Sequence, residues 1–210
     1  MNLRRCIEVV APPLCAACAA AAGRIEPLCA TCRAELRWLG DAVDVAELRL
    51  WAPVAYEGPA RGLVTALKFR GAYRAAEAMA SQIAANAPPG LLDGAHLVPV
   101  PLHPRRLRRR GFNQAELLGR ALAERAGLPL SACLERVGPS ATQVGRDRAK
   151  RLLAPAGTVR IRRGAKPPEK AILVDDVATT GGTLAACAGV LRDAGTAVMW
   201  AVAYARTPGR

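Results

Sequence analysis

The chain has 210 residues, of which 51% are apolar, enough for one medium-sized domain or a domain with a small appendage. Its 30 Lys and Arg outnumber 17 Asp and Glu and give a formal charge of +13, so a polyanionic partner or a phosphate-rich ligand fits the composition. No run of about 18 uncharged apolar residues occurs, which argues against a membrane-spanning helix.

The first residues, MNLRRCIEVVAPPLCAAC, share some features with a signal peptide, because two arginines precede an apolar stretch. Glu8 and the Pro12-Pro13 pair interrupt that stretch, and no lipobox precedes Cys15 or Cys18. We therefore expect a mature chain located in the cytoplasm.

Four of the seven cysteines form two C-x2-C pairs separated by ten residues: Cys15, Cys18, Cys29 and Cys32. Two such pairs can place four thiolates around one tetrahedral ion and leave no open position, which is typical of structural zinc. The alternatives are disulfides, which a reducing cytosol disfavours, or coincidence. Cys6 is either a spare ligand or a small buried residue, and Cys133 and Cys187 lie in apolar patterns that predict core positions.

Beyond the cysteines, apolar runs alternate with helical patterns, which predicts a parallel sheet covered on both faces. Helices are predicted over 60–71, 72–87 and 113–127, the last beginning after Asn113 and ending at Gly127, and another starts near Thr183. Strands are predicted over 50–58, 96–101, 130–137, 157–161, 171–175 and 196–205. We expect a zinc-ribbon-like module over residues 1–45 and an α/β domain over 46–210, with the boundary inside 38–52.

The stretch AILVDDVATTGGTLAACAGVL (171–191) places two acids where its strand is expected to end. Ligands of open α/β sheets bind at this edge. The glycines and hydroxyls that follow can cradle an anion with the free N–H groups of the next helix. The aspartates would then face ribose hydroxyls and magnesium, so the arrangement suits a sugar phosphate. The alternative is a helix-capping cluster after an acidic strand end. Neither a P-loop nor a G-x-G-x-x-G fingerprint occurs.

LVDDVATTGGT (173–183) resembles the phosphoribosyl-pyrophosphate (PRPP) signature of type I phosphoribosyltransferases, and the whole chain resembles the ComF competence-protein family. The resemblance also includes the paired cysteines, ALKFRG (66–71), VPVPLHPRRLRRRGFNQAELL (98–118) and TQVGRDRAKR (142–151). RRRGFNQAELL is the most specific of these segments. The resemblance implies a type I phosphoribosyltransferase fold, with a hood loop, behind the N-terminal zinc module.

The resemblance also assigns residues to roles. Asp175 and Asp176 would act on the ribose as the catalytic pair. PRPP would contact Lys68, Arg70, Pro101, Leu102, His103, Arg106, Arg110, Val177, Ala178, Thr179, Thr180, Gly181, Gly182 and Thr183. A hood loop carrying Gln143, Arg148 and Arg151 would close over the ligand, although the hood continues as LLAPAG where the family has an asparagine and an Ala-Phe pair. Simpler interpretations are a solvated basic face for 105–110, helix-end cations for Lys68 and Arg70, and a capping or packing role for His103.

Two functions remain open at this level. One is magnesium-dependent transfer of a phosphoribosyl group to an unidentified base or amine, for which no general base is evident. The other is a DNA-uptake accessory that binds single-stranded DNA and competence partners such as helicase or recombination proteins. The excess of Lys and Arg over 99–151 suits either a polyphosphate pocket or a nucleic-acid groove, but 4% aromatic residues argue against an extended base-stacking platform. The signature favours PRPP.

Overall fold

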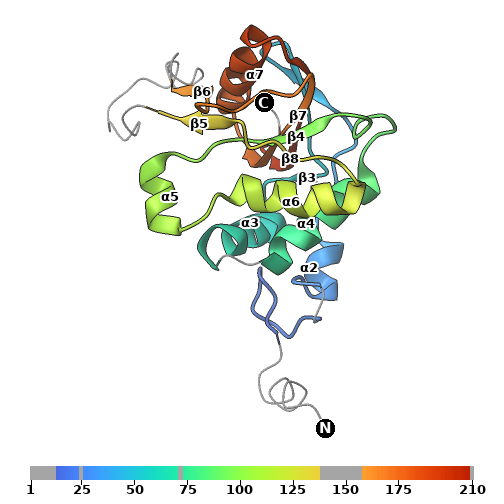
Figure 1. The fold of residues 1–210 in the computed structure, drawn as a ribbon. Coiled ribbons are helices and arrows are strands. Elements are labelled where there is room, and N and C mark those ends of the chain that lie inside the picture. The colour runs from blue at the N-terminus through green and yellow to red at the C-terminus, as the bar shows by residue number, and fades with distance from the viewer. Residues whose placement is uncertain (1–12, 24–25, 71–72, 138–157, 209–210) are drawn as a thin grey trace.

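The computed structural model describes residues 13–23, 26–70, 73–137 and 158–208 (Figure 1). Its helices are α2 (Ala30–Ala34), α3 (Gly58–Arg70), α4 (Tyr73–Asn86), α5 (Pro104–Arg110), α6 (Gln114–Ala126) and α7 (Gly182–Asp193). Its strands are β1 (Val43–Val45), β2 (Leu48–Trp51), β3 (Val54–Ala55), β4 (His96–Pro99), β5 (Leu134–Arg136), β6 (Val159–Ile161), β7 (Lys170–Ala178) and β8 (Ala197–Arg206). None of these helices is long and apolar enough to cross a bilayer.

The main sheet has the strand order β1-β2-β8-β7-β4, and β3 also pairs with β8. All of its pairings are parallel except that of β1 with β2. In the central pair, Leu173 of β7 lies opposite Ala201 of β8, and both side chains are fully buried. The parallel sheet predicted from the apolar runs is therefore confirmed.

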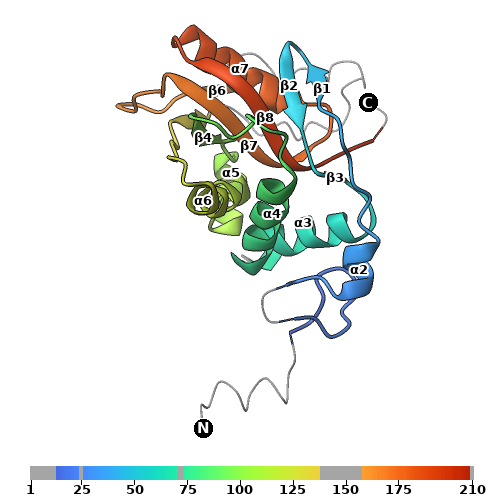
Figure 2. The ribbon, with the colours of Figure 1, turned by 90° about the vertical axis from the view of Figure 1, so that its right-hand side faces the viewer.

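Helices cover both faces of this sheet, as Figure 2 shows: α7 lies on one face, and α3, α4 and α6 lie on the other. Side chains along β7 alternate between the two cores because successive residues of a strand point to opposite faces. Ile172 and Val174 pack into the core under α3, α4 and α6, whereas Ala171 and Leu173 pack into the core under α7. This alternation decides where the acidic residues further along the strand point.

Helix α6 has the ends that the sequence predicts. The Asn113 side chain accepts a hydrogen bond from the Ala115 N–H at 3.1 Å, and Gly127 ends the helix in the left-handed region at φ 66°. Strand β7 is longer than expected, because it continues through both aspartates to Ala178.

The basic run at 105–110 is a helix, α5, which the sequence analysis did not predict. His103 caps it by accepting from the Arg105 N–H, Pro104 occupies its first turn, and Gly111 closes it at φ 83°. The arginines of its last turn also complement the negative end of the helix dipole.

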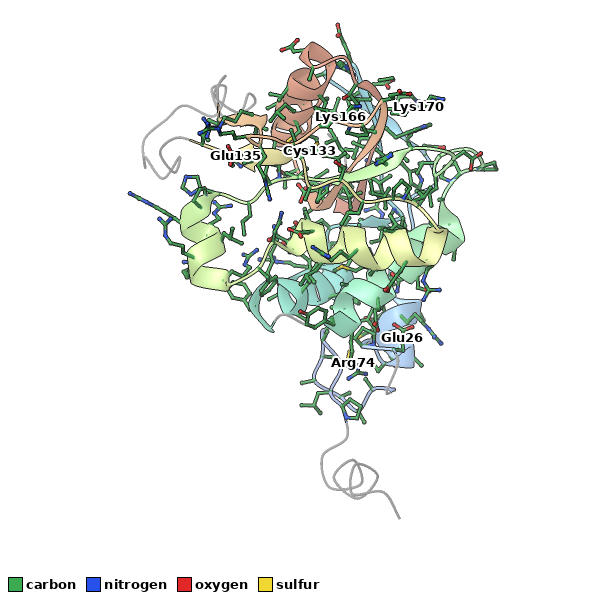
Figure 3. The ribbon with its side chains drawn as sticks, in the orientation of Figure 1. Glu26, Arg74, Cys133, Glu135, Lys166 and Lys170 are labelled. Carbon is green, nitrogen blue, oxygen red and sulfur yellow. The ribbon has the colours of Figure 1, made fainter. Side chains whose placement is uncertain are left out.

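Strands β5 and β6 form a separate antiparallel ribbon rather than extending the parallel sheet. Strand β6 alternates apolar and charged residues, and the only apolar residue of β5, Leu134, lies on the face of Val159 and Ile161, so only one face of the ribbon can be buried. Glu135 and Arg160 pair across its other face at 2.7 Å, and Figure 3 shows Glu135 on this ribbon. The expectation that these two segments belong to the parallel sheet was wrong for this reason.

The N-terminal cysteine segment packs directly against α3. Cys15, Leu28, Cys32 and Leu36 share one apolar core with residues of α3 and the sheet. A Cβ added at Gly62 of α3 would lie 2.7 Å from the Ala17 Cα, so only glycine allows this approach. The division at residue 45 stays a prediction, since nothing in this packing locates a boundary.

We predict that Gly62→Ala destabilises the protein although alanine is the better helix former. The gain in helix propensity is about 1 kcal/mol, whereas forcing a methyl group into a closed contact costs about 1–3 kcal/mol. Gly189→Ala is the matched control, because a Cβ at Gly189 in α7 meets nothing within 4 Å. Urea unfolding should show a lower free energy of unfolding for Gly62→Ala and a higher one for Gly189→Ala. An equal increase in the free energy of unfolding of both variants would show that the cysteine segment does not pack closely against α3 at Gly62.

Candidate functional site

The four cysteines of the two C-x2-C pairs form a compact cluster in which their Sγ atoms all lie within 4.8 Å of one another. The Sγ atoms of Cys18 and Cys29 are 3.7 Å apart. A tetrahedral ion with Zn–S bonds of about 2.3 Å holds its sulfurs about 3.8 Å apart, so the cluster has the dimensions of a zinc site. All four are free thiols in the structure, which gives no support to the disulfide alternative.

Backbone hydrogen bonds favour the thiolate form of Cys15, whereas burial and the neighbouring thiols raise the pKa of Cys32. Burial by itself raises the pKa of Cys15, but backbone N–H groups, those of Cys29, Cys18 and Ala17, donate to its sulfur and lower the pKa to about 6. Metal-binding cysteines must be deprotonated, so this environment suits a ligand. Cys6 lies outside the described residues. Cys133 and Cys187 are buried in the core, as predicted, and Figure 3 marks Cys133.

A second site is a polar cavity of about 340 Å³ at the C-terminal end of β7. Its lining comes from α3, from the segment that follows β4, from α5 and α6, and from β5, β7 and α7: Lys68, Val100, Pro101, Leu102, Arg106, Arg109, Arg110, Gln114, Arg136, Asp175, Asp176, Val177 and Thr183. The edge of the sheet that the sequence analysis singled out is therefore the place where the acidic pair meets cationic side chains.

Nine of the residues expected to act on PRPP line this cavity: Lys68, Pro101, Leu102, Arg106, Arg110, Asp175, Asp176, Val177 and Thr183. The remaining loop residues, Ala178, Thr179, Thr180, Gly181 and Gly182, are not part of its lining. His103 is the N-cap of α5. The Arg70 side chain and the hood residues Gln143, Arg148 and Arg151 lie outside the part of the chain that the structure describes.

The two adjacent aspartates project to different sides of β7, as the alternation along the strand requires. Asp176 is buried and faces α3 and α6, where one of its oxygens lies 2.8 Å from Lys68 Nζ. Its other oxygen accepts a hydrogen bond from the Gln114 side chain at 3.4 Å. Asp175 accepts from the Asp176 backbone N–H at 2.8 Å. In the cavity, the Asp176 carboxylate is therefore already bound by Lys68 and by the Gln114 amide.

Burial raises the pKa of Asp175 well above its ordinary value, and the neighbouring Asp176 carboxylate raises it further. The Asp175 carboxylate in turn adds to the effect of burial on Cys187 of α7, whose thiol has its pKa raised to about 12. Asp175 thus lies on the α7 side of the strand.

Five cationic side chains converge on the cavity from three elements. Lys68 comes from α3, Arg136 from β5, and the other three from one face of α5: Arg106, Arg109 and Arg110. Positions three and four residues apart share a helix face, so the α5 set follows from the helix itself. Burial lowers the pKa of Arg110, the Asp176 carboxylate raises it, and the nearby arginines lower it. Together these groups give the cavity an excess of positive charge, which suits a strongly anionic ligand.

Four lining residues were not among the individual PRPP contacts expected from the sequence, although Arg109 belongs to the basic run 105–110: Val100, Arg109, Gln114 and Arg136. Arg109 and Gln114 fall inside the RRRGFNQAELL segment, so helical spacing and that motif could have indicated them. Arg136 has no such signal. It points into the cavity because Leu134, on the same face of β5, is buried in the core while Glu135 points the other way.

The loop after β7, which carries Gly181, packs against Val45 of the β1–β2 hairpin. Gly181 has a φ of 71°, and a Cβ there would lie 2.2 Å from Cγ1 of Val45. Glycine is therefore required in this loop by backbone conformation and by packing against β1, in addition to any approach of an anion.

The fold and the two sites define a mixed α/β protein with a four-cysteine cluster and an acidic pair among cations at the end of a parallel strand. No family model matches the chain. It is 38% identical over 103 residues to "Competence protein F" of Haemophilus influenzae and 37% identical over 101 residues to "Competence protein ComFC" of Streptococcus pneumoniae. These matches cover 47% of this chain in each case, and less than half of each relative, 44% and 42%.

A longer match is to "DNA utilization protein YhgH" of Salmonella typhimurium, 33% identical over 165 residues, which cover 76% of this chain and 72% of the relative. The chain belongs to the ComF family of competence and DNA-utilisation proteins. The expected α/β class with an N-terminal four-cysteine cluster is confirmed.

Two solved structures are also similar to this chain. The adenine phosphoribosyltransferase of Thermoanaerobacter pseudethanolicus has a TM-score of 0.41 at 16% identity and covers 65% of this chain and 83% of its own. The orotate phosphoribosyltransferase of Aeropyrum pernix has a TM-score of 0.39 at 19% identity and covers 81% of this chain and 75% of its own.

Proposed function

We propose that this protein binds PRPP with magnesium in the cavity at the end of β7 and transfers its phosphoribosyl group to a base or an amine. The observation that carries the proposal is the meeting of Asp175 and Asp176 with five cationic side chains in one cavity. A diol is recognised by carboxylates, and a diphosphate is recognised by arginine and lysine, so the two halves of PRPP match the two halves of the site.

Phosphoribosyl transfer requires few further groups from the protein. When the bond between the sugar carbon and the diphosphate breaks, positive charge develops on the sugar and negative charge on the leaving group. The aspartates would lie against the sugar, and the arginines of α5 with Lys68 and Arg136 would stabilise the leaving diphosphate. Magnesium, bound by the diphosphate oxygens, supplies further neutralisation when present. Loop residues 177–183 and the hood residues keep their expected roles in this proposal.

Calorimetric titration of the full chain with PRPP and magnesium tests the binding step. We expect saturable binding that requires magnesium. A screen of nucleobases and amines for pyrophosphate release then tests transfer. Absence of binding at millimolar PRPP would overturn the proposal, whereas binding without release in any mixture would remove the transferase step alone.

The second candidate function is a DNA-uptake accessory that binds single-stranded DNA and competence partners. It is favoured by the basic helix α5 and by exposed aromatic residues on α3 and α4, of which Phe69 lies beside α5. Arg105 and Arg108 of α5 are exposed, and Phe69 and Tyr73 are 72% and 70% exposed. The Arg110 guanidinium carbon lies 6.0 Å from the Phe69 ring centre. Exposed aromatics among cations can stack on unpaired bases. The longest match, a DNA utilization protein, is named for DNA, and the other two relatives are named as competence proteins.

We predict weak single-stranded DNA binding that competes with magnesium-PRPP, because both anions would use α5. The affinity should fall with salt at a log-log slope of about −0.7 per contacted phosphate. Arg105→Ala with Arg108→Ala should weaken DNA binding and spare PRPP, since neither residue lines the cavity. Arg106→Ala with Arg110→Ala should weaken both ligands. Fluorescence anisotropy measures this competition. DNA binding that is unaffected by saturating PRPP would show that the two sites are separate.

A further inference from the structure

Gln114 is a buried polar side chain that the functions described above leave without a role. It is the first residue of α6 and is 8% exposed. The residue before it, Asn113, caps the helix and donates from its amide to the Val100 carbonyl at 3.0 Å. Because Val100 directly follows β4, this bond ties the start of α6 to the edge of the sheet. The Gln114 side chain is therefore held at the wall of the cavity.

The amide of Gln114 bridges two charged groups of the site. Its Nε2 donates to Asp176 Oδ1 at 3.4 Å, and its Oε1 accepts from Arg110 Nη1. A carboxylate at this position could accept from the guanidinium but would repel Asp176, and an ammonium could donate to Asp176 but would repel Arg110. An amide, which has both a donor and an acceptor, satisfies both partners at once.

The other contacts of these two groups complete a chain across the cavity wall. The second oxygen of Asp176 meets Lys68, whose side chain is 25% exposed. Arg110 lies over Phe69 on its other side. Both charges are thus oriented before a ligand enters, and groups that are already in place cost less to order on binding.

We propose that Gln114 is a positioning residue that orients Asp176 and Arg110 together, so that the sugar end and the diphosphate end of the cavity are set as one unit. This inference rests on the proposed binding of PRPP. Gln114 acts through its two neighbours and needs no contact with the ligand.

The first test concerns the contact itself and uses no ligand. Gln114→Glu should lower the melting temperature, because two carboxylates then face each other in a buried site. Asp176→Asn alone should also lower it, because the ion pair with Lys68 is lost. Combined with Gln114→Glu, it should cost less than the sum of the two single losses, because an amide at 176 can donate to a carboxylate at 114. Losses that simply add would mean that the two side chains are not paired, and would overturn the inference.

The second test separates positioning from stability. Gln114→Met keeps the length and apolar volume of the side chain but removes both bonds. We expect its affinity for magnesium-PRPP to fall by about tenfold or more, because hydrogen bonds that orient charged groups are lost. Its melting temperature should also fall, because Asp176 and Arg110 lose a partner in a buried position, so the affinity is measured well below the unfolding transition and compared with a control of similar kind.

Gln82→Met is the matched control, because Gln82 of α4 accepts a hydrogen bond from the Tyr204 hydroxyl at 2.8 Å and does not line the cavity. It should change stability and leave PRPP affinity unchanged. If Gln114→Met binds magnesium-PRPP with wild-type affinity, the positioning role of Gln114 is refuted and the proposed function is not affected. Absence of PRPP binding by the wild-type protein would overturn the proposed function, and this inference with it.

Discussion

Replacement of Asp175 and Asp176 by asparagine in the same chain is expected to reduce magnesium-PRPP binding at least 100-fold. Asparagine has nearly the same shape as aspartate, but it carries no charge. It also has only one side-chain oxygen that can accept a hydrogen bond from a diol hydroxyl. Two charge-assisted hydrogen bonds of about 1.5–3 kcal/mol each would be lost, which corresponds to a factor of 100 or more. Calorimetric titration with PRPP and magnesium measures the change.

The double variant should still fold. Circular dichroism checks this independently of the ligand, because it reports the sheet and the helices. Asp193→Asn is a suitable control, because Asp193 is an exposed residue at the end of α7, outside the cavity. Asp176→Asn alone should cost more stability than Asp175→Asn alone, because it removes the ion pair with Lys68. PRPP affinity that survives in the double variant would refute the assignment of the acidic pair.

Cys15→Ser is expected to abolish the binding of one zinc ion per chain. The four sulfurs lie within 4.8 Å of one another, and removal of one leaves three ligands that cannot close a tetrahedral shell. The cysteine segment has little core apart from the ion and the surface of α3, so metal binding should contribute much of its folding free energy. Metal analysis of protein purified without chelator, with limited proteolysis of the same samples, measures both effects.

Cys133→Ser provides the control for that experiment. Cys133 is a buried cysteine outside the cluster, so this variant should keep one zinc per chain even if its stability decreases. Cleavage in the region of residues 13–40 should accelerate in Cys15→Ser and not in Cys133→Ser. Wild-type protein that contains no zinc would refute the metal site.

Most of the fold could be predicted from the sequence because the deciding signals are local. Asn113 and Gly127 mark the ends of α6 through hydrogen bonds and backbone angles that involve only neighbouring residues. The apolar runs over 171–175 and 196–205 predict buried parallel strands because both faces of such strands need apolar side chains. The C-x2-C spacing likewise predicts a cluster, since two residues are enough to turn a chain around one ion.

Only the tertiary structure decided which of these residues meet. The bond from Gln114 to Asp176 and the ion pair from Lys68 to Asp176 join residues far apart in the chain, and no local pattern records such contacts. Arg136 enters the cavity because it lies on the face of the ribbon that carries the buried Leu134, and which face is buried depends on pairing with β6. Gly62 is required because Ala17 packs on it, not because of any turn in its own helix. Elements follow from hydrogen bonds and periodicities a few residues long, whereas a site depends on how those elements pack.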